Sequence, residues 1–361
     1  MIEGRNKARM LALRKTGSAF GADVTTAPTP DVPAGHVLVE VAAAGICGSD
    51  LHAYEWSRGY EFMADSLPTT LGHEFAGTVR ALGEGVAEPL LGARVACWPT
   101  IGCGHCAACL SDRRQNCAER RIVGLHSDGG FAEAVSLPAE NCLPIPDGLS
   151  FELAALVEPL GVAINALDVC ELREGENLVV LGPGPIGLAV AVAARLRGCD
   201  EVVLVGRDDP LRLDVAREMG VLHTVDLSAE TLAHGVERTF GGSADRVIEA
   251  TGSLASVTGG LEILRPGGVL VVAGIHSQDL VLDLTNFVRS KKQLRAAHDT
   301  SRDALKEAME LLAGYPELFS MMITQRFPLA DAVQAFEAAR RRAAVKIMLL
   351  PGATAGMGVA R

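Results

Sequence analysis

Four side chains that could take part in catalysis lie within six residues of this 361-residue chain. Cys47, Ser49, Asp50 and His52 bring a thiol, a hydroxyl, a carboxylate and an imidazole together, directly after the apolar, strand-like run 37–44. Such a density of reactive groups behind a strand indicates a functional site.

Cys47 can bind a metal only if further ligands reach it from elsewhere in the chain. A Gly-His-Glu sequence offers His73 and Glu74, and a Val-Glu-Pro-Leu sequence offers Glu158. One sulfur, one nitrogen and carboxylate oxygens form a ligand set suited to Zn²⁺, with a coordination position left for water or substrate, as in a catalytic site. Each residue alone would be interpreted as a core or surface residue, but their joint occurrence favours the metal site.

A second cysteine group has the spacing of a closed metal site. Three thiols follow C-x-x-C-x-x-C spacing and a fourth comes eight residues later: Cys103, Cys106, Cys109 and Cys117. Four thiolates satisfy a tetrahedral structural zinc, so His105 is left out as a ligand. An iron–sulfur cluster shares the first three spacings, but the fourth spacing differs from the ferredoxin form. We therefore expect structural zinc here.

Composition bounds the class of protein. The length exceeds one typical core and predicts two domains. A formal net charge of −11 and a pI near 5.3 argue against nucleic acid or an anionic membrane as a partner held by charge. The first ten residues lack the apolar segment of a secretory signal, and we expect no stretch that spans a bilayer. The odd count of nine cysteines and their spacing favour metal ligation in a reducing compartment, so a cytoplasmic location is expected.

The two halves of the chain differ in pattern. Up to about residue 153 the sequence consists of short strands separated by turns, expected at 37–41, 77–81, 93–96 and 131–135. This pattern predicts a mostly β, partly barrel-like domain. After an apolar helix at 160–172, strands at 177–181, 201–205, 246–250 and 269–273 alternate with helices, which predicts an α/β domain with a doubly wound parallel sheet.

The first of these strands leads into a G-x-G-x-x-G turn and a helix rich in Ala and Leu. In this context the glycines permit a tight turn and bring a dinucleotide pyrophosphate to the start of the helix. The residues assigned to the cofactor from this turn, and from the end of the strand at 269–273, are Gly182, Gly184, Pro185, Ile186, Gly187, Ala273, Gly274 and Ile275.

The end of the second strand bears on the choice between NAD and NADP. A carboxylate there would bind the ribose hydroxyls of NAD, but the position is Gly206 and is followed by Arg207. The Arg207 guanidinium could bind a 2′-phosphate, with Arg212 as a second contact. Asp208 and Asp209 argue for NAD, although Asp209 before a proline has the form of a helix N-cap. We favour NADP.

Taken together, these motifs resemble the medium-chain zinc-dependent alcohol dehydrogenases, in the branch that contains sorbitol and threonine dehydrogenases. The resemblance covers nearly the whole chain. The matching stretches are 45–50, 72–74, the four-cysteine lobe, 158–160, 182–187, 327–329 and 346–349. It implies a GroES-like catalytic domain made of residues 1–156 plus 296–361, with a Rossmann dinucleotide-binding domain, 157–295, inserted into it.

The resemblance also implies roles for single residues. Cys47, His73 and Glu74 resemble catalytic-zinc ligands, and Glu158 a carboxylate that binds the ion directly or through water. Zinc of this kind can stabilise a bound alkoxide. The resemblance gives these further roles: Ser49 binds the substrate oxygen, His52 relays its proton, and Asp50 is an outer partner of a ligating imidazole.

The expected activity is hydride transfer between a secondary alcohol or polyol and NAD(P). Two zinc ions per chain, a small-molecule alcohol or carbonyl substrate, and a homo-oligomer, dimer or tetramer, are expected with it. L-Threonine 3-dehydrogenase-like oxidation of an amino alcohol is a second hypothesis, because the stretch 52–56 resembles threonine dehydrogenases. Two more hypotheses are a non-catalytic zinc- and dinucleotide-binding protein and a zinc-free quinone-reductase-like relative. The complete ligand set argues against both of these.

Overall fold

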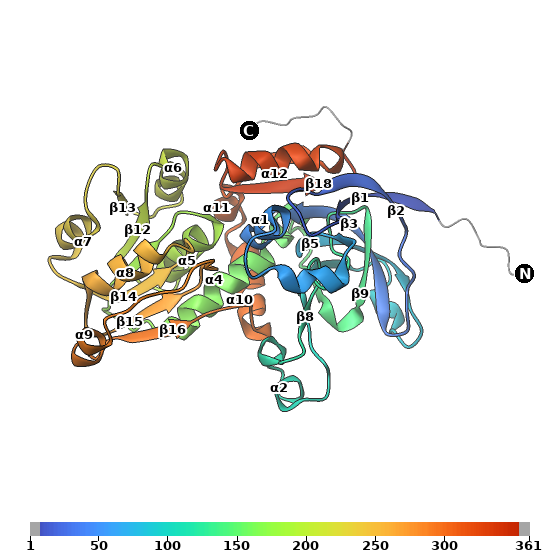
Figure 1. Cartoon of the computed structure of the whole chain (residues 1–361). Coiled ribbons are helices and arrows are strands. Elements are labelled where there is room, and N and C mark those ends of the chain that lie inside the picture. Colours follow the sequence, from blue (N-terminus) through green and yellow to red (C-terminus); the bar gives the residue numbers. More distant parts are fainter. Residues whose placement is uncertain (1–7, 354–361) are drawn as a thin grey trace, which may run out of the picture. The chain divides into compact units, whose positions relative to one another are not determined.

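The computed structural model describes residues 8–353 and divides into two compact units (Figure 1). The first comprises Met1–Glu158, Met309–Pro316 and Ile323–Arg361, and the second Pro159–Ala308 and Glu317–Met322. The sequence-based division placed 296–308 in the catalytic domain. In the structure this segment lies in the second unit, directly after a strand, β16 (Gln293–Ala296), which belongs to that unit's parallel sheet.

A seven-stranded sheet forms the centre of the first unit, with the strand order β10-β6-β5-β3-β18-β17 and β9 paired to β3. Its members are β3 (His36–Gly45), β5 (Glu74–Leu82), β6 (Arg94–Cys97), β9 (Ala134–Pro138), β10 (Cys142–Pro144), β17 (Ile323–Pro328) and β18 (Lys346–Leu350). A three-stranded sheet adds β1 (Arg9–Lys15), β2 (Asp23–Pro28) and β4 (Thr69–Thr70). The mostly β character expected from the sequence is confirmed, although the strand expected at 131–135 begins three residues later.

Strand β3 lies in the middle of this sheet. Val37, Val39 and Val41 alternate into the core, as the period of two in a β-strand requires. The strand pairs antiparallel with β5, and the register places Gly45 opposite Glu74. The same end of β3 also pairs with β18, where Met348 lies opposite Gly45. Three segments that are distant in sequence therefore meet at the end of β3.

A helix that the sequence pattern did not predict follows at once. Helix α1 (Gly48–Glu55) begins after Cys47 and carries Ser49, Asp50 and His52. Later in the unit, a 3₁₀ turn, η5 (Leu329–Asp331), leads into α12 (Ala332–Arg340). Both α1 and the strand end that precedes it are needed to place the reactive groups.

The second unit is a six-stranded parallel sheet in the order β13-β12-β11-β14-β15-β16. Its strands, besides β16, are β11 (Leu178–Leu181), β12 (Val202–Gly206), β13 (His223–Asp226), β14 (Ala244–Glu249) and β15 (Leu264–Val272). Every residue of β11 is buried, as expected for a strand covered on both faces. The doubly wound sheet predicted from the sequence is confirmed.

Helices connect these strands and pack on them. The order of strands reverses between β11 and β14, and in open α/β sheets ligands bind at such a switch point. The connecting helices are α5 (Pro185–Leu196), α6 (Pro210–Glu218), α7 (Leu232–Phe240), α8 (Leu254–Ile263) and α9 (Leu284–Arg289).

The remaining elements connect or flank the two sheets. The helices are α2 (Ala107–Leu110), α3 (Phe151–Ala154), α4 (Val157–Cys170), α10 (Arg302–Gly314) and α11 (Pro316–Ser320). The short 3₁₀ helices are η1 (Glu61–Ser66), η2 (Glu88–Leu90), η3 (Arg114–Asn116) and η4 (Ala139–Asn141), and a small hairpin-like pair is formed by β7 (Thr100–Ile101) and β8 (Arg121–Ile122).

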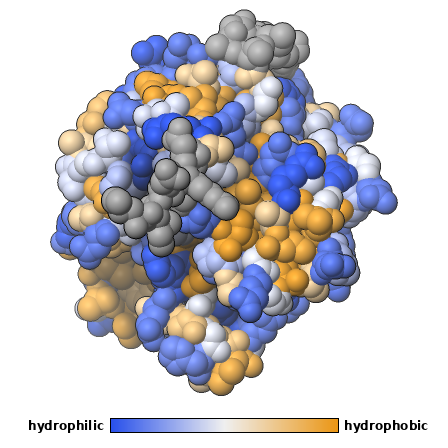
Figure 2. Space-filling model, turned by 90° about the vertical axis from the view of Figure 1, so that its right-hand side faces the viewer, coloured by the Kyte–Doolittle hydropathy of each residue, from blue (hydrophilic) through white to orange (hydrophobic). Residues whose placement is uncertain are grey.

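One helical stretch was not singled out by the expectation that the chain has no segment that spans a bilayer. Phe151–Cys170 is long and apolar enough, but 78% of its most apolar window is buried inside the protein, as in a core helix of a globular fold. Figure 2 shows one face of the surface, on which hydrophilic and hydrophobic residues are intermixed.

Candidate active site and metal centres

The candidate active site in the first unit starts at the junction of β3 and α1. Cys47 occupies the N-cap position of α1 in an extended conformation. The backbone N–H of Cys47 donates to Asp50 Oδ2 at 3.0 Å, so Asp50 closes the first turn as the carboxylate of a capping box does. Asp50 is completely buried, and its other carboxylate oxygen faces His73.

His73 lies between Asp50 and Cys47. Its Nδ1 is 3.4 Å from Asp50 Oδ1, and the Cys47 thiol also acts electrostatically on the ring. Both Nδ1 and Asp50 Oδ1 are buried and lack a hydrogen bond of ordinary geometry. A ligating histidine commonly has a carboxylate at its second ring nitrogen, which fixes the ring for metal binding. The structure therefore places Asp50 as the sequence predicted it, beside the candidate ligand His73.

The Glu74 carboxylate is held by a lysine. Lys346 Nζ lies 2.6 Å from Glu74 Oε2 and 2.8 Å from Oε1, and it donates to the Ile46 carbonyl oxygen at 3.0 Å. Both side chains are almost fully buried. A Cβ on Gly45 would collide with Glu74 Oε2, so glycine at the end of β3 leaves room for this ion pair. In the sequence, Lys346 belongs only to the stretch 346–349 that matches the family, and its contact with Glu74 was not predicted, because nothing local in the sequence links residues 74 and 346.

The charges of this region favour a bound cation. Three buried carboxylates, on Asp50, Glu74 and Glu158, lie in the same unit as the buried Lys346. Burial alone would lower the pKa of His73, but the neighbouring Asp50 and Cys47 raise it well above the ordinary value. Burial and then Glu74 raise the pKa of the Cys47 thiol. Protons thus bind strongly at these two side chains, as expected where negative charge is concentrated.

The donor atoms of the four predicted ligands do not all lie close to one another. Within residues 8–353, no three of the donor atoms of Cys47, His73, Glu74 and Glu158 lie mutually within 4.8 Å. Glu74 is held away from the other donor atoms because its carboxylate forms the ion pair with Lys346. Glu158 also acts electrostatically on Lys346 and on Cys97. The thiol, the imidazole and a carboxylate nevertheless form a donor set that fits zinc.

Ser49 and His52 lie on α1 beside these groups, together with a tyrosine that the sequence motifs do not include. Tyr60 is buried, and its ring stacks on the His52 ring at a centroid distance of 5.4 Å. Burial lowers the pKa of His52, so its imidazole is neutral at pH 7. Tyr54 and Trp56, which follow on the same stretch, pack into the core.

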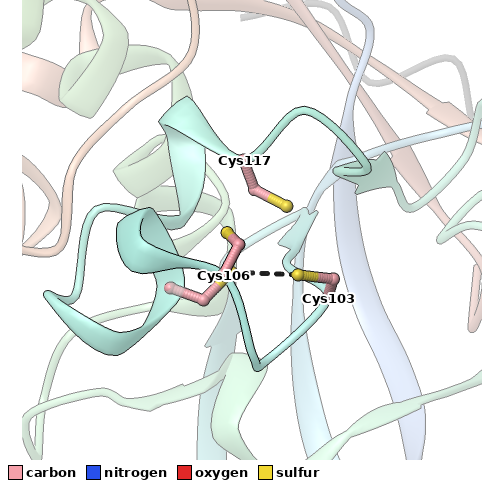
Figure 3. A group of neighbouring side chains, drawn as sticks. Cys103, Cys106 and Cys117 are labelled. Carbon is pink, nitrogen blue, oxygen red and sulfur yellow. Dashed lines mark hydrogen bonds between the residues drawn. The ribbon is translucent and has the colours of Figure 1, made fainter.

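The four-cysteine lobe is assembled as predicted from its spacing. The sulfur atoms of Cys103, Cys106, Cys109 and Cys117 all lie within 4.8 Å of one another, and Cys103 and Cys109 are 4.0 Å apart. A tetrahedral site with Zn–S bonds of about 2.3 Å has sulfur–sulfur edges of about 3.8 Å. Figure 3 shows the thiols of Cys103, Cys106 and Cys117 converging from the loop around α2 and η3. These residues fit a structural zinc.

The glycine turn in the second unit has the geometry of a dinucleotide site. Gly182 adopts φ +110°, which permits the sharp turn after β11. A Cβ on Gly187 would strike the Gly182 carbonyl oxygen, so the third glycine lets the helix approach the strand. Gly184 is the N-cap of α5 and has open space beside it, with Pro185 at the first helical position and Ile186 next. The first N–H groups of α5 are thus available to an anion.

The two candidate arginines that follow β12 lie in different environments. Arg207 is exposed and forms no ion pair with any other described residue. Arg212 is mostly buried and pairs with Asp209 at 3.4 Å. Asp209 is the N-cap of α6 ahead of Pro210, as the sequence predicted. Asp208 adopts a left-handed conformation, with φ +49°, and its N–H donates to Asp226.

The segment after β15 contacts the end of β14. The N–H groups of Ala273 and Gly274 donate to the Glu249 carbonyl oxygen at 2.8 and 3.1 Å, and a Cβ on Gly252 would strike the Ile275 carbonyl oxygen. The buried Glu249 carboxylate also binds His276 Nε2 at 3.0 Å. Ala273, Gly274 and Ile275 therefore lie at the carboxyl edge of the sheet, near its switch point.

Comparison with known proteins agrees with these features. Residues 33–147 match the family model of the alcohol dehydrogenase GroES-like domain, and residues 185–314 match that of the zinc-binding dehydrogenases. The chain is 33% identical to L-galactonate-5-dehydrogenase of Escherichia coli K12, over 83% of this chain and 86% of that protein. It is 32% identical to L-threonine 3-dehydrogenase of Bacillus subtilis 168, over 95% of this chain and 99% of that protein.

Solved structures are similar over nearly the whole chain. A putative zinc-binding dehydrogenase from Sinorhizobium meliloti bound to NADP superposes with a TM-score of 0.84 at 29% identity, covering 96% of this chain and 100% of that one. An Escherichia coli CFT073 alcohol dehydrogenase complexed with NADH gives a TM-score of 0.85 at 26% identity, with coverages of 95% and 99%. The chain thus belongs to the medium-chain zinc-dependent alcohol dehydrogenases, oxidoreductases that use zinc and a nicotinamide dinucleotide.

Proposed function

We propose that this enzyme oxidises a secondary alcohol or polyol to the carbonyl compound, and catalyses the reverse reaction, at the site around Cys47 and His73. The observation that carries the proposal is the arrangement of His73, which lies between the Cys47 thiol and the buried Asp50 carboxylate. Cys47 and His73 would hold the catalytic zinc together with a carboxylate from Glu74 or Glu158.

The chain's own residues have distinct roles in this proposal. Zinc supplies a positive charge that stabilises the anionic form of the substrate oxygen. The nicotinamide ring exchanges the hydride. Ser49 hydrogen-bonds the substrate oxygen, and the neutral imidazole of His52 accepts the proton that the alcohol loses. Asp50 holds the ring of His73 in place and caps α1, so it acts by positioning rather than by taking the proton.

The names of relatives support two substrate classes. Sorbitol dehydrogenase of Bacillus subtilis is 30% identical over 91% of this chain, which supports a polyol. The threonine dehydrogenase described above matches a larger part of the chain, which supports an amino alcohol as the second candidate. A screen of sorbitol, butane-2,3-diol and L-threonine with both nicotinamide cofactors separates them.

The proposal includes a preference for NADP. Gly206 offers no carboxylate to the ribose, and Arg207 is exposed and free to bind a 2′-phosphate. Arg212 supports this less, because Asp209 already binds its guanidinium. Steady-state kinetics of the wild type and of Arg207→Ala with both cofactors test the preference. A wild type that prefers NAD, or a variant with undiminished NADP affinity, would contradict it.

The four-cysteine lobe would bind a second zinc with a structural role, so two ions per chain are proposed. None of the nine cysteines forms a disulfide, which suits a reducing compartment such as the cytoplasm. Metal analysis combined with alcohol-dependent cofactor reduction tests the whole assignment. About two zincs with turnover support the dehydrogenase, whereas one zinc without turnover would support a binding protein.

The second unit also supports a homo-oligomer, dimer or tetramer. Strand β16 is the edge of the parallel sheet. Exposed apolar side chains lie on it and on the preceding segment around α9: Val281, Leu284, Val288 and Leu294. A second copy that pairs β16 with β16 across a two-fold axis would cover both the edge and the apolar side chains. Sedimentation of the wild type and of Val288→Asp tests this; an unchanged oligomer in the variant would contradict the interface.

Cys47→Ala should abolish turnover and leave dinucleotide binding intact, because the ligand belongs to the first unit and the glycine turn to the second. Cofactor binding is measured by fluorescence titration with NADPH. Normal activity in this variant would refute the site assignment.

A further inference from the structure

We propose that His105 and Glu119 form, together with the Cys103 sulfur, a loading site through which zinc enters and leaves the four-cysteine lobe. The inference rests on the proposed structural zinc and adds two residues that the thiol spacing does not include. One donor atom from each of His105, Glu119 and Cys103 lies within 4.8 Å of the other two. The Cys103 sulfur is equally close to the other three thiols of the lobe, so it belongs to both groups of ligands.

The two groups of ligands differ in their exposure to solvent. The side chains of His105 and Glu119 are 75% and 71% exposed. Cys103 is half-buried, and Cys117 is only 1% exposed. An ion that arrives from solvent therefore meets the imidazole and the carboxylate before it reaches the innermost thiol. Imidazole nitrogen and carboxylate oxygen are both ligands that zinc accepts beside sulfur.

The backbone places His105 beside Cys103. Gly104, between them, has φ +79°, a left-handed conformation that favours glycine. His105 Nδ1 lies 3.0 Å from the Cys103 carbonyl oxygen. Because a carbonyl oxygen only accepts, Nδ1 carries the hydrogen of the neutral ring, and Nε2 keeps its lone pair. This is a form in which an imidazole can bind a metal.

Glu119 reaches the same point from the end of the lobe, two residues after Cys117. It lies in a turn that the Arg120 N–H closes by donating to the Cys117 carbonyl oxygen at 3.2 Å. Glu119 Oε1 is 3.9 Å from His105 Nε2. This separation is too long for a hydrogen bond. A zinc ion with bonds of about 2.0–2.2 Å to each atom fits between them.

The shared cysteine makes a short path between the loading site and the four-thiolate site. His105 and Glu119 release the ion while Cys103 retains it, and the thiols of the other three cysteines replace the nitrogen and oxygen ligands. Each thiol that becomes a ligand loses its proton to solvent, and nothing is oxidised or reduced. Release of zinc follows the same steps in reverse.

The experiment measures zinc exchange in the folded, zinc-loaded protein. The protein is mixed with an excess of zinc enriched in one stable isotope, and the bound isotope is followed by mass spectrometry. A Cys47→Ala background removes the ion expected at the catalytic site, so exchange at the lobe is observed alone. His105→Ala and Glu119→Gln should each slow exchange about tenfold or more, since loss of a group that supports a metal site lowers its affinity by about 10- to 100-fold.

The zinc content and the melting temperature of both variants should equal those of the parent protein. A loading site accelerates entry and exit equally, and the four thiolates that hold the ion are unchanged. His105→Cys and Glu119→Asp keep a ligand atom at each position. They should exchange zinc faster than His105→Ala and Glu119→Gln, respectively.

His234→Ala is the matched control. The His234 ring is 69% exposed, and its Nδ1 lies 2.9 Å from Glu230 Oε2. Within residues 8–353 this imidazole–carboxylate pair belongs to no group of three possible metal ligands. Its exchange rate should equal that of the parent protein. Slower exchange in His234→Ala as well would show that any exposed imidazole supplies zinc, and would overturn the inference.

Two further outcomes would overturn the inference. One is an unchanged exchange rate in His105→Ala and Glu119→Gln. The other is a lower zinc content in these variants, because His105 and Glu119 would then hold the structural ion rather than load it. A parent protein whose zinc content is unaffected by Cys106→Ser would instead refute the proposed structural zinc itself.

Discussion

The substitution Lys346→Met tests the buried ion pair at the end of β3. In the wild type, Lys346 binds both oxygens of Glu74 and the Ile46 carbonyl oxygen, and it is 1% exposed. Methionine has a similar length and no charge, so it fills the volume while it leaves the Glu74 carboxylate buried and unpaired. Burial alone would lower the pKa of Lys346, yet Glu74 raises it above the ordinary value, so the lysine is charged at neutral pH.

Removal of one partner of a buried ion pair costs about 3–5 kcal/mol of stability, because the remaining charge is neither solvated nor paired. We expect Lys346→Met to lose this amount of stability, because both members of the pair are buried in the core. Replacement of both members should cost much less. The double variant Glu74→Gln/Lys346→Met should therefore be more stable than Lys346→Met, within about 1–2 kcal/mol of the wild type.

The assay is urea unfolding followed by tryptophan fluorescence. Trp56 and Trp98 are the two tryptophans of the chain, and both lie in the first unit, so the signal reports the unit that contains the pair. Unfolding is measured in metal-free and zinc-loaded protein. If Glu74 is a zinc ligand, zinc replaces the missing positive charge and reduces the loss in Lys346→Met. If Glu158 is the carboxylate ligand, the loss is the same in both forms.

A metal-free Lys346→Met variant within about 1 kcal/mol of the wild type would refute this reasoning, because it would mean that water reaches the Glu74 carboxylate.

Three further predictions concern the steric room beside Glu74, the four-cysteine lobe and the charge of His52. Gly45→Ala should displace the Glu74 carboxylate and lower the free energy of unfolding by about 1–3 kcal/mol in the same urea assay. The control Gly48→Ala, whose added Cβ meets open space, should not lower it. Equal stabilities of the two variants would contradict the steric argument. Cys106→Ser should lower the melting temperature and remove about one zinc per chain, because a closed four-thiolate site contributes to folding, and unchanged zinc content in this variant would count against the lobe. Because burial lowers the pKa of His52, its imidazole should stay neutral down to below pH 6.5. The kcat of alcohol oxidation should therefore decline only in more acidic buffer, and this decline should be absent from the kcat profile of His52→Ala. Stability should also fall in acid. Because the unfolded chain binds the His52 proton more readily than the folded chain, the free energy of unfolding should decrease as the pH falls through and below about 6.5.

Local patterns in the sequence were sufficient for much of the fold. The strand predicted at 177–181 is present as β11, and the glycine turn that follows it has the φ value and the close strand–helix approach that its spacing implied. Thiol spacing predicted the four-cysteine lobe, since ligands separated by two residues can reach the same ion without contributions from distant segments. Asp209 before Pro210 likewise predicted the start of α6. In each case the information lies within a few consecutive residues.

The tertiary structure alone decided which distant groups meet. Lys346 pairs with Glu74 because the antiparallel register of β18, β3 and β5 brings residues 346, 45 and 74 to the same end of the sheet, and no local pattern encodes that register. Tyr60 stacks on His52 only through the loop that follows α1, a helix that the sequence pattern did not predict. The chemistry-bearing residue types could be identified from the sequence because their identity and spacing are local properties. Their partners, and therefore their pKa values and orientations, depend on packing between segments far apart in the chain.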